Sequence, residues 1–333
     1  MATIKDVAKL AGVALSTASL ALGEGGRVSP ATRQKVLEAA RELNYQKNGF
    51  AMDLKRSQTR TIALILSDLS GPYFSELIQS VQDFALSRGY DLIACSSVGG
   101  QDSTAVKFLR EKRVDGAIVL AHNVSNEVLQ ESAREGFPIV VLDRVVLGDY
   151  LINVLVDGEQ GGYEATKYLI EQGHRRIAYI SGPVNSYDNI QRYSGYQRAL
   201  SEHALQELKK WNVIGHFTQE GGFQATKMLI LQGDLPEAIF YANDEMALGG
   251  MKALAESGIR IPEQVSVIGY DDIFQSQYVQ PSLTTIRQPK YEAGSMAAHL
   301  LFQALEGQFV NKSYKFSVEL VERNSCAPSL VRK

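Results

Sequence analysis

Hydrophobic residues recur with helical spacing in residues 3–11 and again in residues 15–22. At the start of the first stretch, Thr3 and Asp6 have the spacing of a capping box, which satisfies free backbone donors at a helix start. Gly12 can adopt the positive φ that ends a helix. The pattern predicts two short helices joined by a tight turn.

The second predicted helix has an apolar side and a side rich in hydroxyl groups, which Ser16, Thr17 and Ser19 supply. Hydroxyls on a short exposed helix suit the phosphate oxygens that a helix meets in a DNA major groove. The pattern therefore favours a helix-turn-helix. Small helical domains without a DNA function show the same order of helix, glycine and helix, so these two stretches alone leave both interpretations open.

A third helical stretch and the charge distribution favour DNA binding. Residues 28–45 have Ser29 as the N-cap and Pro30 in the first helical position, and their apolar face completes a three-helix core. Residues 1–60 contain ten lysines and arginines and five acidic residues, which is a net charge of +5. The whole chain carries −3, so the remainder carries −8. A basic module joined to a larger acidic body is expected of a nucleic-acid-binding protein.

From residue 61 the pattern changes to short apolar runs that alternate with amphipathic segments. Continuous apolar runs are typical of parallel strands covered on both faces, and alternation with helices predicts a doubly wound sheet. The predicted strands are 62–66, 92–95, 117–120, 139–142, 177–180, 239–241 and 265–268. The predicted helices are 74–87, 105–112, 127–134, 164–171, 193–202, 222–231 and 245–256. We expect two α/β halves in tandem.

Polar residues follow most of these predicted strands. Ligands bind in the crevice at the carboxyl ends of parallel strands, so a two-lobed body with a ligand cleft is expected. Asp and Asn after a strand serve as helix caps or turn formers more often than as ligand groups, and only their convergence on one crevice favours a site. The residues in question include Ser67, Asp68, Asp143, Arg144, Ser181, Asn243, Asp244, Asp271 and Asp272.

Several protein classes do not fit the sequence. The chain shows no signal-peptide core and no run near the roughly 20 apolar residues of a membrane span, so we expect a cytoplasmic protein without membrane contact. Cys95 and Cys326 are isolated, which favours two reduced thiols. The five histidines show no ligand spacing, and we expect no metal and no cofactor. No local motif assembles a nucleophile with its base, so we expect no enzyme.

The strings TIKDVAKLAGVALSTASLAL (3–22) and RVSPATRQKVLEAARELNYQKN (27–48) resemble the N-terminal domain of the lactose-repressor/galactose-repressor family of bacterial transcription regulators. Further along, IALILSDLSGPYFSEL, VDGAIVL, ANDEMALGGMKAL and VSVIGYDD are similar to the periplasmic-binding-protein-like body that this family uses as its effector domain. The resemblance implies an all-α helix-turn-helix head on an α/β body of two doubly wound parallel-sheet subdomains.

The resemblance also implies which residues contact DNA. Leu15, Ser16 and Leu20 would face the bases, and Thr17 and Ser19 the phosphates. A hinge helix ordered by the operator would add paired leucines in the minor groove. The full set of expected DNA contacts is Thr3, Leu15, Ser16, Thr17, Ser19, Leu20, Asn48, Ala51 and Leu54.

The chain departs from the family pattern at some of these positions. Leu15 and Leu20 stand where the family usually has polar residues or arginine, and leucine can touch only thymine methyl groups. We therefore expect an unusual operator, read more through DNA deformability. Ala14 replaces a serine cap, Lys47 replaces a proline, and Asp53 places a negative charge near phosphates.

For the effector, the resemblance implies an aromatic pair that stacks on a ring, an aromatic on the opposite wall, and charged groups that hold oxygens. Aromatic faces with Arg and Asp suit a sugar and would also suit a nucleobase. The sequence does not separate a free sugar from a sugar phosphate, a purine or a protein partner. The expected effector residues are Tyr73, Phe74, Asp143, Arg192, Phe223, Asn243 and Asp271.

The expected domains are a helix-turn-helix (1–46), a hinge (47–60) and an effector and dimerisation body (61–333). Within the body we expect an N-subdomain of about 61–157 and 289–315 and a C-subdomain of about 158–287 and 318–333. The expected function is a homodimeric, ligand-controlled regulator of operator DNA, a repressor of carbohydrate genes. The alternative is a two-lobed sugar-binding protein without DNA function, which would need a signal peptide and no basic head.

Overall fold

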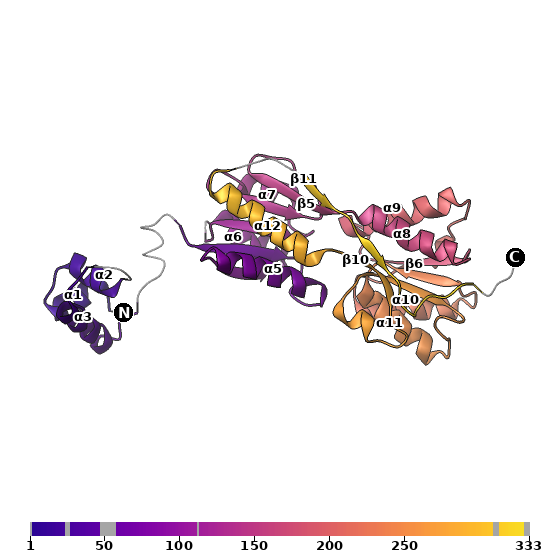
Figure 1. Cartoon of the computed structure of the whole chain (residues 1–333), viewed down its shortest axis with the longest axis horizontal. Helices are drawn as coiled ribbons and strands as arrows, with labels where there is room; N and C mark the ends of the chain where they lie inside the picture. The colour runs from indigo at the N-terminus through magenta and orange to yellow at the C-terminus, as the bar shows by residue number, and fades with distance from the viewer. Residues whose placement is uncertain (1, 24–26, 47–57, 112, 309–312, 330–333) are drawn as a thin grey trace. The chain divides into compact units, whose positions relative to one another are not determined.

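A computed structural model of the chain describes residues 2–23, 27–46, 58–111, 113–308 and 313–329 (Figure 1). The chain divides into two compact units, Met1–Thr59 and Arg60–Lys333. The expected hinge contacts Asn48, Ala51 and Leu54 lie outside the described residues.

The first unit contains the three predicted helices: α1 Ile4–Ala11, α2 Leu15–Leu22 and α3 Pro30–Glu42. The Asp6 carboxylate accepts hydrogen bonds from the backbone N–H and the hydroxyl of Thr3, both at 2.8 Å. Gly12 has φ 64°, the left-handed conformation that ends α1. The three helices close over a small core made of Val7, Ala8, Ala18, Ala21, Val36, Ala39 and Ala40.

The first half of the body is a parallel sheet with strand order β11-β5-β4-β3-β1-β2. Its strands are β1 Thr61–Leu66, β2 Asp91–Ser96, β3 Gly116–Leu120, β4 Ile139–Leu142, β5 Leu151–Val156 and β11 Ser313–Phe316. Its helices are α5 Tyr73–Ser87, α6 Thr104–Arg110, α7 Asn126–Ser132 and α12 Lys290–Leu305, with a 3₁₀ turn η1 Gly100–Asp102.

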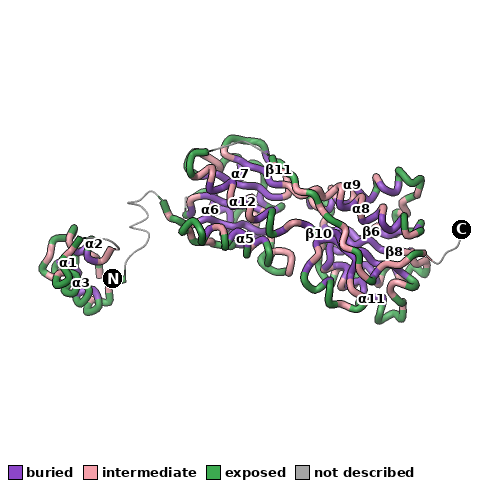
Figure 2. The backbone as a smooth tube through the Cα atoms, viewed as in Figure 1, coloured by how far each residue is buried: buried purple, intermediate pink, exposed green. Residues whose placement is uncertain are grey.

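Both faces of the central strands β1, β3 and β4 are covered, as their continuous apolar runs predict, whereas the edge strand β2, expected to be covered too, is mostly exposed. Along β1, Ile62 and Leu64 belong to the core under α5 and α12, whereas Ala63 and Ile65 belong to the core under α6 and α7. All four side chains are fully buried, and Figure 2 shows the centre of this half as its buried part. Burying a large apolar side chain contributes about 1.5–3 kcal/mol, so the run stabilises both layers.

The second half is a sheet with strand order β12-β10-β9-β8-β6-β7, parallel except for the pair of β10 and β12. Its strands are β6 Ile177–Ser181, β7 Asn212–Ile214, β8 Ala238–Tyr241, β9 Ser266–Asp271, β10 Thr284–Arg287 and β12 Glu319–Val321. Its helices are α8 Gly158–Glu171, α9 Tyr187–Glu202, α10 Gln219–Leu231 and α11 Asp244–Glu256, with 3₁₀ turns η2 Lys209–Trp211 and η3 Phe274–Gln277. Figure 1 shows α8 and α9 together on one side of this sheet and α10 and α11 on the other.

The chain passes between the two sheets three times. It leaves the first sheet after β5, returns between β10 and α12, and leaves again between β11 and β12. Helix α12 therefore packs against α5 although more than 200 residues separate them in the sequence. The passages put the carboxyl ends of the two sets of strands on either side of one crevice.

Two helices begin six residues earlier than their sequence pattern predicts. Helix α8 begins at Gly158 instead of residue 164, and α9 begins at Tyr187 instead of residue 193. The first turns of α8 contain Gly161 and Gly162, which have low helix propensity. These glycines are there for packing, because a Cβ on Gly162 would overlap the carbonyl oxygen of Arg192 on α9.

Candidate functional site

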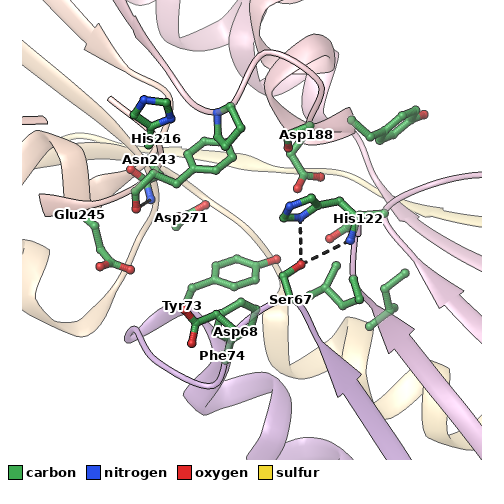
Figure 3. Close-up of a pocket in the computed structure, with 18 of the residues that line it drawn as sticks. Ser67, Asp68, Tyr73, Phe74, His122, Asp188, His216, Asn243, Glu245 and Asp271 are labelled. Carbon is green, nitrogen blue, oxygen red and sulfur yellow. Dashed lines mark hydrogen bonds between the residues drawn. The ribbon is translucent and has the colours of Figure 1, made fainter. Parts of the chain in front are cut away.

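A cavity of about 270 Å³ lies between the two halves of the body, at the carboxyl ends of the strands. In the first half it is lined by residues that follow β1, β3 and β4. In the second half it is lined by residues that follow β6, β7, β8 and β9. Figure 3 shows these side chains pointing from both halves into the same space.

Aromatic rings form opposite walls of the cavity. Tyr73 and Phe74, at the start of α5, lie edge to face with ring centroids 5.4 Å apart. Phe217 lines the other half, and the Arg192 guanidinium lies 5.6 Å from the centre of its ring. A flat ligand can therefore be held between apolar faces that approach it from the two halves.

Arg192 and Asp271 form a buried ion pair on the second half. An Arg192 guanidinium nitrogen (Nη2) lies 3.5 Å from the Asp271 carboxylate, and the other terminal nitrogen donates to the carbonyl of Ala242 at 2.5 Å. The guanidinium also stacks 4.0 Å from the ring centre of Tyr270. The Gln288 amide donates to Asp271 at 2.6 Å. These contacts fix both charged groups before any ligand arrives.

Three carboxylates of the cavity, Asp143, Asp188 and Asp271, are held in conditions that disfavour their charge. Burial raises the pKa of Asp271 to about 6, although Arg192 and Lys290 oppose the rise. Burial, with the charge of Asp188 second, raises the pKa of Asp143 well above its ordinary value. Burial also raises the pKa of Asp188, against the pull of Arg192. Each of these groups gains from a ligand that donates hydrogen bonds to it.

Asn243 has a structural role as well as a place in the cavity wall. Its side-chain oxygen accepts from the backbone N–H of Met246 at 3.0 Å and so caps α11. Its side-chain amide donates to the carbonyl of Phe217 at 3.1 Å. Asn243 thus positions the aromatic wall as well as lining the cavity.

The backbone is strained at several lining residues. Asp143, His216, Phe217 and Asp271 all have positive φ, between 58° and 113°, in the left-handed region that favours glycine. Such conformations cost on the order of 1–3 kcal/mol each, and they persist where the surrounding structure fixes them. They lie at or just after the ends of β4, β7 and β9, where the chain borders the cavity.

Behind the cavity wall, Asp244 ties three segments together. Its carboxylate accepts from the Ile273 N–H at 2.9 Å, the Ser276 hydroxyl at 2.7 Å and the Thr285 hydroxyl at 2.6 Å. The side chain is fully buried, and burial raises its pKa to about 7. This network holds the connection after β9, which carries Asp271.

The structure brings six of the seven expected effector residues to the cavity wall: Tyr73, Phe74, Asp143, Arg192, Asn243 and Asp271. The expectation for Phe223 is wrong, because this residue does not line the cavity. It lies on α10, with the ammonium groups of Lys227 and Lys252 at 5.4 Å and 5.7 Å from its ring centre. The wall that Phe223 was expected to form is made by Phe217, which lies before α10 rather than within it.

Sequence reasoning missed several other lining residues, among them His122, Asp188 and Glu245. Asp188 lies in the first turn of α9, a turn that the sequence pattern places before the helix. His122 follows β3, and its ring shares a 2.9 Å hydrogen bond with the Ser67 hydroxyl (Figure 3). A search for polar residues after every strand would have found His122, but no local signal marks Asp188.

In the first unit, α2 presents the residues expected to contact DNA. Leu15 and Leu20 are 44% and 51% exposed, and Ser16 and Ser19 are exposed as well. Thr17 is half-buried, while Ala18 and Ala21 face the core. Thr3 is exposed at the start of α1. Ala14 makes no side-chain cap at the start of α2, in line with the loss of the family's serine.

The described part of the chain shows no metal-binding cluster and no membrane-spanning helix. No group of three His, Cys, Asp or Glu side chains there is arranged to hold a metal ion. Cys95 and Cys326 are free thiols. Among the described residues, no helix has the length and apolar character needed to cross a membrane.

Comparison with known proteins gives the same two-part division. Residues 3–48 match the family model "Bacterial regulatory proteins, lacI family", and residues 166–326 match the model "Periplasmic binding protein-like domain". The chain is 38% identical to the HTH-type transcriptional repressor PurR of Vibrio atlanticus (strain LGP32), over 98% of each chain.

Two solved structures resemble almost the whole chain. The lac repressor dimer bound to operator and the anti-inducer ONPF superposes with a TM-score of 0.79 at 30% identity, covering 98% of this chain and 99% of that one. The transcriptional regulator CelR in complex with cellobiose gives a TM-score of 0.72 at 30% identity, covering 98% and 100%.

Proposed function

This chain belongs to the lacI family of bacterial regulatory proteins, and from that premise we propose that a sugar bound in the cleft controls how tightly the head holds operator DNA. The chain is a ligand-responsive, DNA-binding transcription regulator and not a solute-binding protein alone. Its relatives are named repressors, and we propose repression as its action.

The cavity wall is the observation that carries the sugar proposal. Aromatic faces at Tyr73, Phe74 and Phe217 suit the C–H faces of a sugar ring. Arg192 and Asp271 lie beside them, fixed in orientation, and charged partners hold hydroxyl groups strongly. The similar CelR structure was solved with cellobiose, which supports the same ligand class.

On the DNA side, we propose that α2 of each head enters a major groove and that two chains bind as a homodimer. The basic net charge of residues 1–60 supports phosphate contact, and the similar lac repressor was solved as a dimer on its operator. A two-fold symmetric dimer matches a near-palindromic operator. Such a protein works where the chromosome lies, so we place it in the cytoplasm.

The test of the cleft is the thermal midpoint of the full chain against free sugars, sugar phosphates and nucleobases. A ligand that binds only the folded state raises the midpoint by mass action. We expect a sugar to raise it in the wild type and in the surface variant Arg110→Ala, and not in Arg192→Ala or Asp271→Ala. A shift that survives both cleft substitutions would place the binding elsewhere.

A nucleobase is the second candidate effector, because aromatic rings on two walls can also stack on a flat heterocycle. The same panel separates the two. Midpoint shifts with hypoxanthine, guanine or adenine and with no sugar would replace the sugar by a purine. That outcome would leave the assignment of the cleft, the DNA-binding role of the head and the function as a regulator unchanged.

We also propose that the cleft binds its effector without changing it, since the relatives are transcriptional repressors. The prediction is that sugar recovered after long incubation with the full chain is chemically unaltered by mass spectrometry. A product that accumulates with time in the wild type and not in Asp271→Ala would contradict it.

A further inference from the structure

The cavity wall carries more negative than positive charge. Five carboxyl side chains line it: Asp68, Asp143, Asp188, Glu245 and Asp271. Arg144 and Arg192 are the two arginines of the wall, and among the described residues no lysine lines it. With neutral histidines the lining therefore has a formal charge of −3, an unfavourable setting for an anionic ligand.

Both arginines are already engaged with the protein. Arg144 donates its terminal nitrogens to the carbonyls of Ala121 and Val124 at 2.9 Å and 2.6 Å, which leaves its Nε without a partner among the described residues. Arg192 is shared between the carbonyl of Ala242 and the Asp271 carboxylate. An arginine binds phosphate most strongly through two parallel hydrogen bonds from a free guanidinium fork, and neither arginine offers one.

The carboxylates Asp143 and Asp188 come from opposite halves and lack a cation of their own. Asp143 follows β4 in the first half, whereas Asp188 lies in the first turn of α9 in the second. In the described part of the chain, no lysine or arginine nitrogen lies within 4.0 Å of either carboxylate. Burial raises the pKa of both carboxyls, and the nearby Arg192 charge opposes the rise for each of them. A phosphate group would add roughly two further negative charges at neutral pH.

The start of α9 does not reverse this balance. A helix N-terminus favours anions, and Ser186 makes no side-chain cap there. Asp188, however, already supplies a negative charge to that first turn. At the start of α11 the Asn243 side chain occupies the position that an anion would take. At the starts of α9 and α11, side chains of the protein thus already match the positive helix end.

We infer that the cleft is specific for an unphosphorylated, uncharged sugar and that Asp188 and its neighbouring carboxylates exclude sugar phosphates. Sugar hydroxyls can donate to the carboxylates of both halves at once, which phosphate oxygens cannot do. The inference rests on the proposed sugar effector and adds which chemical form of the sugar is bound.

The experiment is isothermal titration of the full chain at pH 7.5 with matched pairs: ribose and ribose 5-phosphate, glucose and glucose 6-phosphate, fructose and fructose 6-phosphate. For the sugar that binds, we expect its phosphate to bind at least about 100-fold more weakly. In Asp188→Asn the ratio of the two affinities, free sugar over sugar phosphate, should fall at least about tenfold, because one repulsive charge is removed. Glu245→Gln provides the same test if Asp188→Asn does not fold.

The control is Asp149→Asn, which removes an exposed carboxylate outside the cavity and should leave the affinity ratio unchanged. A phosphate that binds as tightly as its free sugar overturns the inference and leaves the sugar proposal standing. An affinity ratio that neither Asp188→Asn nor Glu245→Gln reduces also overturns the inference, because the sugar phosphate would then be excluded by its size and not by charge. If no member of any pair binds, the sugar proposal fails and this inference fails with it.

Discussion

Asp271 affects both ligand binding in the cleft and the folding stability of the protein. It lies at the end of β9, accepts from Gln288 and faces the Arg192 guanidinium. Lys290 donates to its backbone carbonyl at 2.6 Å. The carboxylate is 4% exposed, and its pKa is about 6 in the folded protein against 3.8 for an exposed aspartate. A raised folded-state pKa means that ionising this group opposes folding.

The pH dependence of stability tests this assignment. Between pH 4 and pH 6 the unfolded chain loses the Asp271 proton while the folded chain keeps it. The free energy of unfolding of the wild type, relative to Asp271→Asn, should therefore fall across this range by an amount on the order of 3 kcal/mol and then level off. Urea unfolding of both proteins at a series of pH values measures the difference. A difference that rises with pH would show that Arg192 outweighs burial.

In the head, Leu20 is the residue whose replacement should change DNA sequence preference. Its side chain is 51% exposed on α2 and can contact only apolar groups of the bases. In Leu20→Arg we expect the operator selected from a random DNA library to gain guanine at one position in each half-site, because arginine pairs with guanine in the major groove. Leu10→Arg, an equally exposed leucine on α1, is the control. An unchanged selected sequence would argue against α2 as the reading helix.

At the scale of elements, α2 lacks a side-chain cap that the family pattern would provide. Ala14 has an extended backbone, φ −65° and ψ 151°, which suits a capping serine. Ala14→Ser should stabilise α2 by about 1 kcal/mol. Slower amide hydrogen exchange in α2 of the full chain would measure the gain. Ala31→Ser, within the first turn of α3, is the control and should bring no gain; equal exchange in wild type and Ala14→Ser would contradict the capping argument.

Helices and strands with strong periodicity could be predicted from the sequence, and the misses have physical causes. Continuous burial of β1 on both faces produces an apolar run that cannot be mistaken for a surface strand. The sequence pattern predicts too late a start for α8 because glycines in its first turns have low helix propensity. Only the contact with α9 explains them. The first turn of α9 contains no glycine, but its apolar residues Tyr187 and Ile190 are exposed, so no buried stripe marks the turn that holds Asp188.

The aromatic wall shows a second limit of local pattern. Strand β7 has three residues, too few for a clear alternation, so the sequence pattern does not mark the connection that follows it. Phe217 lies in that connection and lines the cavity, whereas Phe223, which the family resemblance implied, lies on α10 and does not line it. Asp271 could be predicted from its place after a clear apolar strand, whereas Tyr73 and Arg192 were expected only from the family resemblance.

At the scale of the body, the two halves are tied so that the cleft can respond as a unit. Three passages of chain join them, and at the second passage Lys290 opens α12 in the first half. Its buried ammonium donates to the carbonyls of Asp271 and Asp272 in the second half and lies 3.3 Å from the Glu76 carboxylate on α5. A ligand that contacts Asp271 therefore acts on a residue already linked to both halves, which suits hinge closure.

The central claim, that a sugar in the cleft controls DNA binding by the head, is tested most directly by one measurement. The Kd of the full chain for its selected operator is measured with and without a saturating concentration of the sugar that raises the thermal midpoint. Coupling free energies of this kind typically change affinity about 5–150-fold. We predict a change of at least about tenfold in the wild type and none in Tyr73→Ala. Saturation of the cleft with no change in the operator Kd would contradict the account.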